Sequence, residues 1–104
     1  MRPILPSLKE RNRYIVYEVK ERKGFDLVKS KIEDSISKFF GDFESAKANI
    51  LILDDFKDNK GIIKTNAKYV DKVKVALMLM KDPVVEAVGV SGTIKKARLN
   101  FMGG

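Results

Sequence analysis

Apolar side chains along this chain alternate in some stretches and recur at helical spacing in others, which predicts strands interleaved with helices. Residues 13–20 are nearly all β-branched or aromatic, as expected of a strand. Alternation gives this strand two faces, the first with Ile15, Tyr17 and Val19 and the second with Tyr14, Val16 and Glu18. Because both faces carry apolar side chains, we expect both sides of the sheet to be covered.

A helix is predicted after the polar turn at residues 21–24. Its apolar positions recur every three or four residues, at Val28, Ile32, Ile36 and Phe39 or Phe40. Asp26 is the expected N-cap residue, because its carboxylate can accept hydrogen bonds from the first free amides of a helix. Gly41 is expected to end the helix, and a polar link over residues 41–47 follows.

Two strands joined by a tight turn are predicted next. Residues 48–54 place apolar side chains on both faces, Ile50 and Ile52 on one and Leu51 and Leu53 on the other. Residues 57–61 (KDNKG) are strong turn formers. Residues 61–66 then form a short third strand, so we interpret residues 48–66 as a β-hairpin.

A second helix and a terminal helix are predicted in the last third of the chain. The second helix is expected to begin near Lys68 and to end at Asp82-Pro83, because proline disfavours a helical residue before it. Its apolar stripe is wide and comprises Val70, Val73, Val75, Ala76, Leu77, Met78, Leu79 and Met80. The terminal helix can be capped by Ser91 or Thr93. Its apolar side comprises Ile94, Ala97 and Phe101.

With a fourth strand at residues 84–90, the predicted order is strand, helix, strand, strand, helix, strand and a short C-terminal helix. This is the βαββαβ order of the ferredoxin-like split βαβ fold, an α+β two-layer sandwich with two helices on one face of an antiparallel sheet. At 104 residues, the chain is expected to form a single domain, 1–104. The fold hosts RNA-binding proteins, metabolite sensors and enzymes, so the function must be argued from the side chains.

The net charge of +7 is concentrated at the two ends of the chain. Residues 1–13 carry a net +3, residues 93–104 another +3, and residues 14–92 only +1. If both ends lie on one side of the fold, their cations form a local positive field that suits a polyanion such as RNA. Solvated terminal lysines that aid solubility are the alternative interpretation.

The residue types that most enzymatic mechanisms need are missing from this sequence. It has no histidine and no cysteine, so it lacks the usual imidazole base, thiol nucleophile and thiolate metal ligand. Asp54, Asp55 and Asp58 could hold a hydrated Mg²⁺, but aspartate is also an ordinary turn residue. Ser91 lacks both the spacing of a nucleophile elbow and a histidine base. We therefore expect the chain itself to be neither catalytic nor the carrier of a cofactor.

An RNA-recognition motif with this strand order would stack bases on aromatic residues of its sheet. The third strand, residues 61–66, has no aromatic residue, so this mode of binding is disfavoured. We expect Tyr14 and Val16, on the sheet face away from the helices, to contact another protein or the chain's own ends. The second strand and the wide second helix are further candidates for protein contact.

Three segments of the chain resemble archaeal ribonuclease P protein component 2, a Pop-type subunit family. They are residues 5–18 (LPSLKERNRYIVYE), 65–79 (TNAKYVDKVKVALML) and 88–98 (VGVSGTIKKAR), in matching order across nearly the whole chain. The resemblance implies a ribonucleoprotein that removes the 5′ leader from precursor tRNA, in which the RNA subunit holds Mg²⁺ and performs the hydrolysis. It also implies a protein partner, ribonuclease P protein component 3, in a heterotetramer with two copies of each.

For contact with the ribonuclease P RNA we select eight cations. They are Lys9, Arg11, Arg13, Lys64, Lys68, Lys95, Lys96 and Arg98. They would neutralise phosphates, release counterions and lower the Mg²⁺ that the RNA needs. No apolar stretch has the length of a signal peptide core or a spanning helix, so we expect a cytoplasmic protein without membrane contact.

Two alternative functions remain open from the sequence. A ferredoxin-like regulatory domain could bind a small metabolite, with an anion held on the backbone amides of the turn at residues 89–92. A ribosomal or other RNA-scaffold protein would share the basic ends and would differ in the RNA that copurifies with it.

Overall fold

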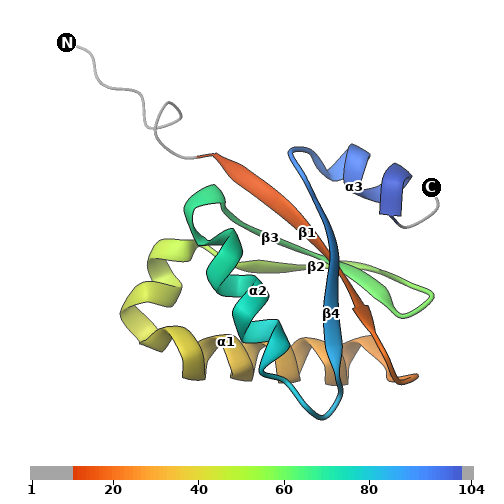
Figure 1. Cartoon of the computed structure of the whole chain (residues 1–104), viewed down its shortest axis with the longest axis horizontal. Coiled ribbons are helices and arrows are strands. Elements are labelled where there is room, and N and C mark those ends of the chain that lie inside the picture. The colour runs from red at the N-terminus through yellow and green to blue at the C-terminus, as the bar shows by residue number, and fades with distance from the viewer. Residues whose placement is uncertain (1–10, 102–104) are drawn as a thin grey trace.

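The computed structural model describes residues 11–101, apart from the side chains of residues 42–47 and 101. The elements follow the predicted order (Figure 1). They are β1 (Asn12–Val19), α1 (Phe25–Ala48), β2 (Leu51–Lys57), β3 (Lys60–Asn66), the 3-10 helix η2 (Ala67–Tyr69), α2 (Val70–Met78), β4 (Val85–Ser91) and α3 (Ile94–Phe101). None of the helices in this part of the chain is long and apolar enough to cross a membrane.

The strands form one antiparallel sheet in the order β2-β3-β1-β4. Strand β1 lies inside the sheet, paired with β3 on one side and with β4 on the other. Helices α1 and α2 pack on one face of the sheet, and α3 lies on the other face (Figure 1). This arrangement confirms the predicted ferredoxin-like α+β sandwich with a short C-terminal helix.

The main core lies between the sheet and the layer formed by α1 and α2. The predicted inner face of β1 contributes Ile15, Tyr17 and Val19, each at most 2% exposed. The two helices contribute the apolar positions Val28, Ile32, Ile36, Phe40, Val73, Ala76 and Leu77. Burial of these side chains supplies the main driving force for folding. The periodicity in the sequence therefore identified most of this core.

A second, smaller core lies on the opposite face of the sheet, beneath α3. Its fully buried members are Val16 of β1, Ile62 of β3 and Ala97 of α3. Half-buried side chains packed around them are Tyr14, Leu53, Val88 and Ile94. The chain's own C-terminal helix thus covers part of the second apolar face, as one of the two sequence-based options predicted. The predicted contact of Phe101 lies outside the described side chains.

Helix α1 does not end at Gly41, as we predicted, but continues to Ala48. Gly41 has a φ of 81° and a ψ of 165°, so it interrupts the helix and redirects the chain before helical geometry resumes. The predicted polar link over residues 41–47 is therefore wrong. Strand β2 begins at Leu51, three residues later than predicted, after Asn49 ends the helix with a φ of 53°.

The starts of α1 and α2 also differ from the prediction. Asp26 is not the N-cap of α1, because Gly24 occupies that position and Asp26 lies in the first turn. Its carboxylate there still interacts favourably with the positive end of the helix dipole. Helix α2 is preceded by η2, where the Asn66 side chain accepts a 3.0 Å hydrogen bond from the Lys68 amide. Helix α2 ends at Met78, before the expected stop at Pro83.

The predicted hairpin between β2 and β3 is confirmed, with a two-residue turn at Asp58 and Asn59. Both residues have positive φ, 54° and 63°, which is the conformation of the type I′ turn that suits twisted antiparallel strands. The carbonyl of Asn59 accepts a 2.7 Å hydrogen bond from the Val19 amide at the end of β1. The hairpin is therefore fixed to the middle of the sheet at this end.

Candidate nucleic-acid interface

The start of β1 and the end of β4 lie side by side at one end of the sheet (Figure 1). Tyr14 pairs with Ser91 of β4 and with Lys64 of β3. The amide of Ala67, at the start of η2, donates a 2.7 Å hydrogen bond to the carbonyl of Arg11. Segments that are far apart in the sequence thus meet at the same place.

These pairings bring six of the eight predicted RNA-binding cations to one end of the sheet. We call this group the basic end. One of the six precedes β1, and the others come from β1, β3, η2 and the first turn of α3: Arg11, Arg13, Lys64, Lys68, Lys95 and Lys96. Like charges held near one another on a surface create a field that attracts a polyanion. Lys9 lies outside the described residues.

The cations of the basic end surround the end of the sheet and do not line up on one face. Arg13 pairs with Thr65, whose hydroxyl donates a 3.0 Å hydrogen bond to the carbonyl of Ala48 in α1, so Arg13 belongs to the face with α1 and α2. Lys64 pairs with Tyr14 and belongs to the face that carries α3. A phosphate chain could therefore be contacted while it wraps over the end.

The first turn of α3 points two lysines away from the protein. Thr93 caps the helix, as one of the two predicted options, and its hydroxyl accepts a 3.1 Å hydrogen bond from the Lys96 amide. Ile94 and Ala97 face the second core, whereas Lys95 and Lys96 are exposed. Thr93 occupies one of the amides that an anion would need at this helix start, which weakens the case for a small-anion site here.

Arg98 differs from the other predicted cations because it is paired within the chain. Its Nε atom lies 2.7 Å from Oδ2 of Asp55 in β2. The hydrogen bond and the charge of this carboxylate raise the pKa of Arg98. The ion pair ties α3 to the far edge strand, and it compensates a charge that we had assigned to RNA contact. Nothing in the sequence identifies Asp55 as the partner, since the two residues are 43 positions apart.

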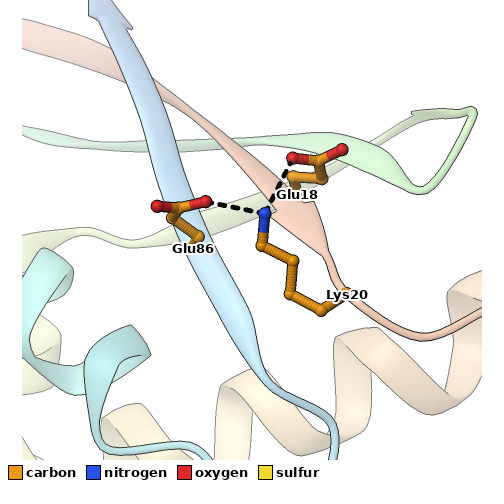
Figure 2. A network of polar contacts seen from close by, with 3 residues as sticks. All are labelled: Glu18, Lys20 and Glu86. Carbon is orange, nitrogen blue, oxygen red and sulfur yellow. Dashed lines mark hydrogen bonds and ion pairs between the residues drawn. The ribbon is translucent and has the colours of Figure 1, made fainter.

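Lys20 is also neutralised within the chain, at the opposite end of β1. Its Nζ atom lies 2.8 Å from Glu86 and 3.2 Å from Glu18, and the two carboxylates pair across β1 and β4 (Figure 2). Hydrogen bonds to Glu86 and then to Glu18 raise the pKa of Lys20. The ammonium separates two like charges that would otherwise repel each other across the sheet.

The residues predicted for protein contact lie beneath α3. Val16 is fully buried and Tyr14 is half-buried, so the contact is made by the chain's own helix α3, the second of the two predicted options. Val16 is 0% exposed, so it cannot contact another molecule while α3 is in place. Tyr14 retains some exposure at the margin of the helix.

The wide second helix instead exposes an apolar surface on the outer side of the helical layer. We call it the helical patch, and it comprises Phe39 of α1 (41% exposed) and Val75 (39%), Met78 (73%) and Leu79 (57%) of α2 and its C-cap. A groove of about 430 Å³ between the helices is lined in part by Phe39 and Leu79. Large apolar side chains grouped in this way mark protein interaction sites.

Asp54, Asp55 and Asp58 do not form a metal site in the described part of the chain. Among the side chains that the structure describes, no group of three or more aspartate, glutamate, histidine or cysteine residues is placed to hold a metal ion. Asp55 is engaged with Arg98, and Asp58 forms the hairpin turn.

Comparison with known proteins identifies relatives along nearly the full length. Residues 13–102 match the Rpp14/Pop5 family. A protein of Pyrococcus abyssi named ribonuclease P protein component 2 is 32% identical over 98% of this chain and 93% of its own length. Proteins with the same name from Methanocaldococcus jannaschii and Thermococcus gammatolerans are 33% and 32% identical. These matches cover 99% and 93% of this chain and 81% and 88% of the two relatives.

Proposed function

The chain belongs to the Rpp14/Pop5 family, and we propose that it is a non-catalytic subunit of a cytoplasmic ribonuclease P that binds and stabilises the catalytic RNA. The observation that carries the proposal is the basic end, where β1, β3, η2 and α3 bring six cations together. The relatives named ribonuclease P protein component 2 support the choice of RNA. The absence of histidine and cysteine from the sequence supports a role other than catalysis.

The basic end would act on the RNA through its phosphates. Lysine and arginine side chains that neutralise phosphates release condensed counterions, and the affinity then falls steeply with salt. Phosphate contacts of this kind position an RNA without reading its sequence. In the proposed holoenzyme the RNA holds Mg²⁺ and removes the 5′ leader of precursor tRNA. The protein lowers the Mg²⁺ concentration that the RNA needs to reach its active conformation.

The helical patch would hold the protein partner, which we propose to be ribonuclease P protein component 3 in a heterotetramer with two copies of each chain. The patch lies on the outer side of α1 and α2, whereas the cations of the basic end surround one end of the sheet, with Arg13 on the face of these helices and Lys64 on the face of α3. The two surfaces are separate, so one chain can contact RNA and a protein at the same time.

Reconstitution tests the RNA role directly. Ribonuclease P RNA, component 3 and this chain are combined, and cleavage of precursor tRNA is measured over a Mg²⁺ titration. We expect the chain to lower the Mg²⁺ needed for half-maximal cleavage. The double variant Lys95→Glu and Lys96→Glu should require more Mg²⁺, bind the RNA more weakly and show a flatter dependence of affinity on salt.

The matched control is Lys29→Glu with Lys31→Glu, which makes the same change of charge on α1. It should bind the RNA alone with the affinity and salt dependence of the unaltered chain. An equal effect of the two double variants would show that only net charge matters, and it would remove the basic end as the RNA site.

The helical patch has its own test. Met78→Glu with Leu79→Glu should abolish binding of component 3, measured by calorimetry, and leave the affinity for RNA close to that of the parent. Leu27→Glu with Val84→Glu places the same charges at two other exposed aliphatic positions and serves as the control. Retained binding of component 3 by the patch variant would place the protein interface elsewhere.

A further inference from the structure

A cavity lies at the end of the sheet opposite the basic end, between the turn that joins β1 to α1 and the β2–β3 hairpin. We call it the hairpin cavity. Its volume is about 410 Å³, and it is lined by Arg22, Lys23, Phe56, Asp58 and Asn59. The hydrogen bond from the Val19 amide to the Asn59 carbonyl joins its two walls.

We propose that the hairpin cavity binds an unpaired nucleotide of RNA, with the phosphate on Arg22 and Lys23 and the base against Phe56. The proposal deepens the RNA-binding function proposed above and rests on it. The volume falls within the range of about 300–1,000 Å³ that is usual for small-molecule sites. Unpaired bases, unlike those in a duplex, are free to leave the stack and enter such a space.

Two cations of the cavity wall suit a phosphate. Arg22 is exposed, and Lys23 is half-buried and forms a long ion pair of 3.9 Å with Glu21. Lys20, two residues before Arg22, forms ion pairs with Glu18 and Glu86 (Figure 2). The cations of this turn that line the cavity are therefore Arg22 and Lys23. Asp58 also lines the cavity, and its charge favours a ligand that places the phosphate on the opposite wall.

Phe56 offers the apolar surface that a base needs. Its ring is half-buried, with centroid distances of 5.6 Å to Phe25 and 6.4 Å to Tyr17. These two rings support Phe56 from the core, so its position is fixed before any ligand arrives. Aromatic side chains held in this way serve as stacking platforms for bases of single-stranded RNA.

Asn59 supplies polar groups at the edge of the same cavity. The hairpin turn holds its backbone at a φ of 63°, and its carbonyl is fixed by the Val19 amide. The side-chain amide has both donors and an acceptor, which matches the mixed hydrogen-bonding edge of a base. The groove beside the helical patch also has lysines and a phenylalanine in its wall, but there they lie beside the aliphatic side chains of Leu79 and Met80, whereas the hairpin cavity adds the amide of Asn59.

The two RNA contacts would lie far apart. Strand β1 has eight residues and therefore a length of roughly 25 Å. The basic end sits at its start and the hairpin cavity at its finish, so a single RNA must extend along the molecule to reach both. Loss of one contact should leave the other in place, which makes the two sites separable by experiment.

Binding of two RNA probes by the full chain tests the proposal. The probes are a mixed-sequence single-stranded 12-mer and a 12-base-pair RNA duplex. We expect amide NMR shifts of residues 22–24, 56, 58 and 59 with the single strand only. Phe56→Leu keeps an apolar side chain but removes the ring, and it should weaken single-strand binding by about tenfold while leaving duplex binding unchanged. Arg22→Glu with Lys23→Glu should weaken single-strand binding and lower its salt slope by roughly one to two.

Lys29→Glu with Lys31→Glu is again the control for charge and should leave these affinities close to those of the parent. If Phe56→Leu does not fold, as judged by its melting temperature, the charge variant and the NMR shifts decide the question. Unshifted amides in the cavity, or equal losses for duplex and single strand, would overturn the nucleotide site. In that case binding that still depends on Lys95 and Lys96 would leave the proposed function standing, whereas a chain that binds neither probe and no ribonuclease P RNA would refute both.

Discussion

The ring of Tyr17 lies over Gly61 of the neighbouring strand and fills the space that a side chain at position 61 would occupy. The two residues pair directly across β1 and β3. A Cβ atom at position 61 would overlap the hydroxyl and the ring of Tyr17. Gly61 is therefore required by the packing of its partner, whereas the sequence placed it only at the junction of the turn and the third strand.

Replacement of Gly61 by alanine should lower the free energy of unfolding by about 1–3 kcal/mol, because the inserted methyl group displaces a buried aromatic ring. Chemical denaturation measures the loss. Gly92→Ala is the matched control, since a Cβ there meets nothing within 4 Å. Equal stabilities of the two variants would contradict the packing argument.

Tyr17→Phe should raise the free energy of unfolding at neutral pH by about 1 kcal/mol, because the removed group costs energy where it stands. The hydroxyl of Tyr17 is buried and has no hydrogen-bond partner among the described residues. Phenylalanine keeps the ring over Gly61 and its contacts with Phe56. Urea denaturation of both proteins at pH 7 tests this, and a variant less stable than the parent would reveal a partner for the hydroxyl.

The same variant predicts how stability changes in alkali. Burial raises the pKa of Tyr17 above its ordinary value of 10.0. Above pH 10 the unfolded chain therefore loses this proton while the folded chain retains it, and stability falls as the pH rises further. Tyr17→Phe should lose less stability than the parent between pH 9.5 and about 11.5. Parallel alkaline denaturation curves for the two proteins would exclude Tyr17 as a contributor.

Asp55→Asn should increase the affinity for ribonuclease P RNA if Arg98 belongs to the RNA-binding surface. The substitution releases Arg98 from its 2.7 Å ion pair and also removes one negative charge. Asp54→Asn makes the same change of charge at an exposed neighbour and is the control. We expect a gain of roughly two- to fivefold for Asp55→Asn over the control at low salt, which disappears at high salt. Equal affinities would exclude Arg98 from the surface.

Thr93→Ala should weaken the start of α3. The lost hydrogen bond to the Lys96 amide leaves an unpaired donor at the helix start, which typically costs about 1 kcal/mol. Hydrogen exchange of the amides at positions 95 and 96 should become faster. Thr93→Ser retains the oxygen and should behave like the parent, and fast exchange in both variants would point to a cause other than the cap.

The hydrophobic periodicity was sufficient to predict the strands, the helices and their order, because the faces of β1, α1 and α2 all meet one core. It failed at Gly41, where glycine was interpreted as a helix end. A positive φ can end a helix or bend it, and the choice depends on packing that no local pattern encodes. The three-residue shift of β2 follows from that single misinterpretation.

The candidate sites were predicted less completely than the fold. The charge distribution placed the excess of cations near both ends of the chain but left open whether they meet, and it is the pairing of β1 with β4 that brings Arg11 and Arg13 to the end of the sheet where α3 begins with Lys95 and Lys96. The pairing of Arg98 with Asp55 could not be predicted, because contacts between distant residues leave no trace in one sequence. Arg22 and Asn59 were interpreted as ordinary turn residues, and only their shared cavity gives them another role.

The C-terminal helix α3 also protects an apolar face of the sheet from water and from other chains. It is short, and it rests on the sheet through Ile94, Ala97 and one ion pair. A chain cut before residue 94 would present Val16 and Ile62 to water on a sheet face that already carries other apolar groups. Such a fragment should self-associate, so C-terminal deletions made to map RNA binding would alter the assembly state as well.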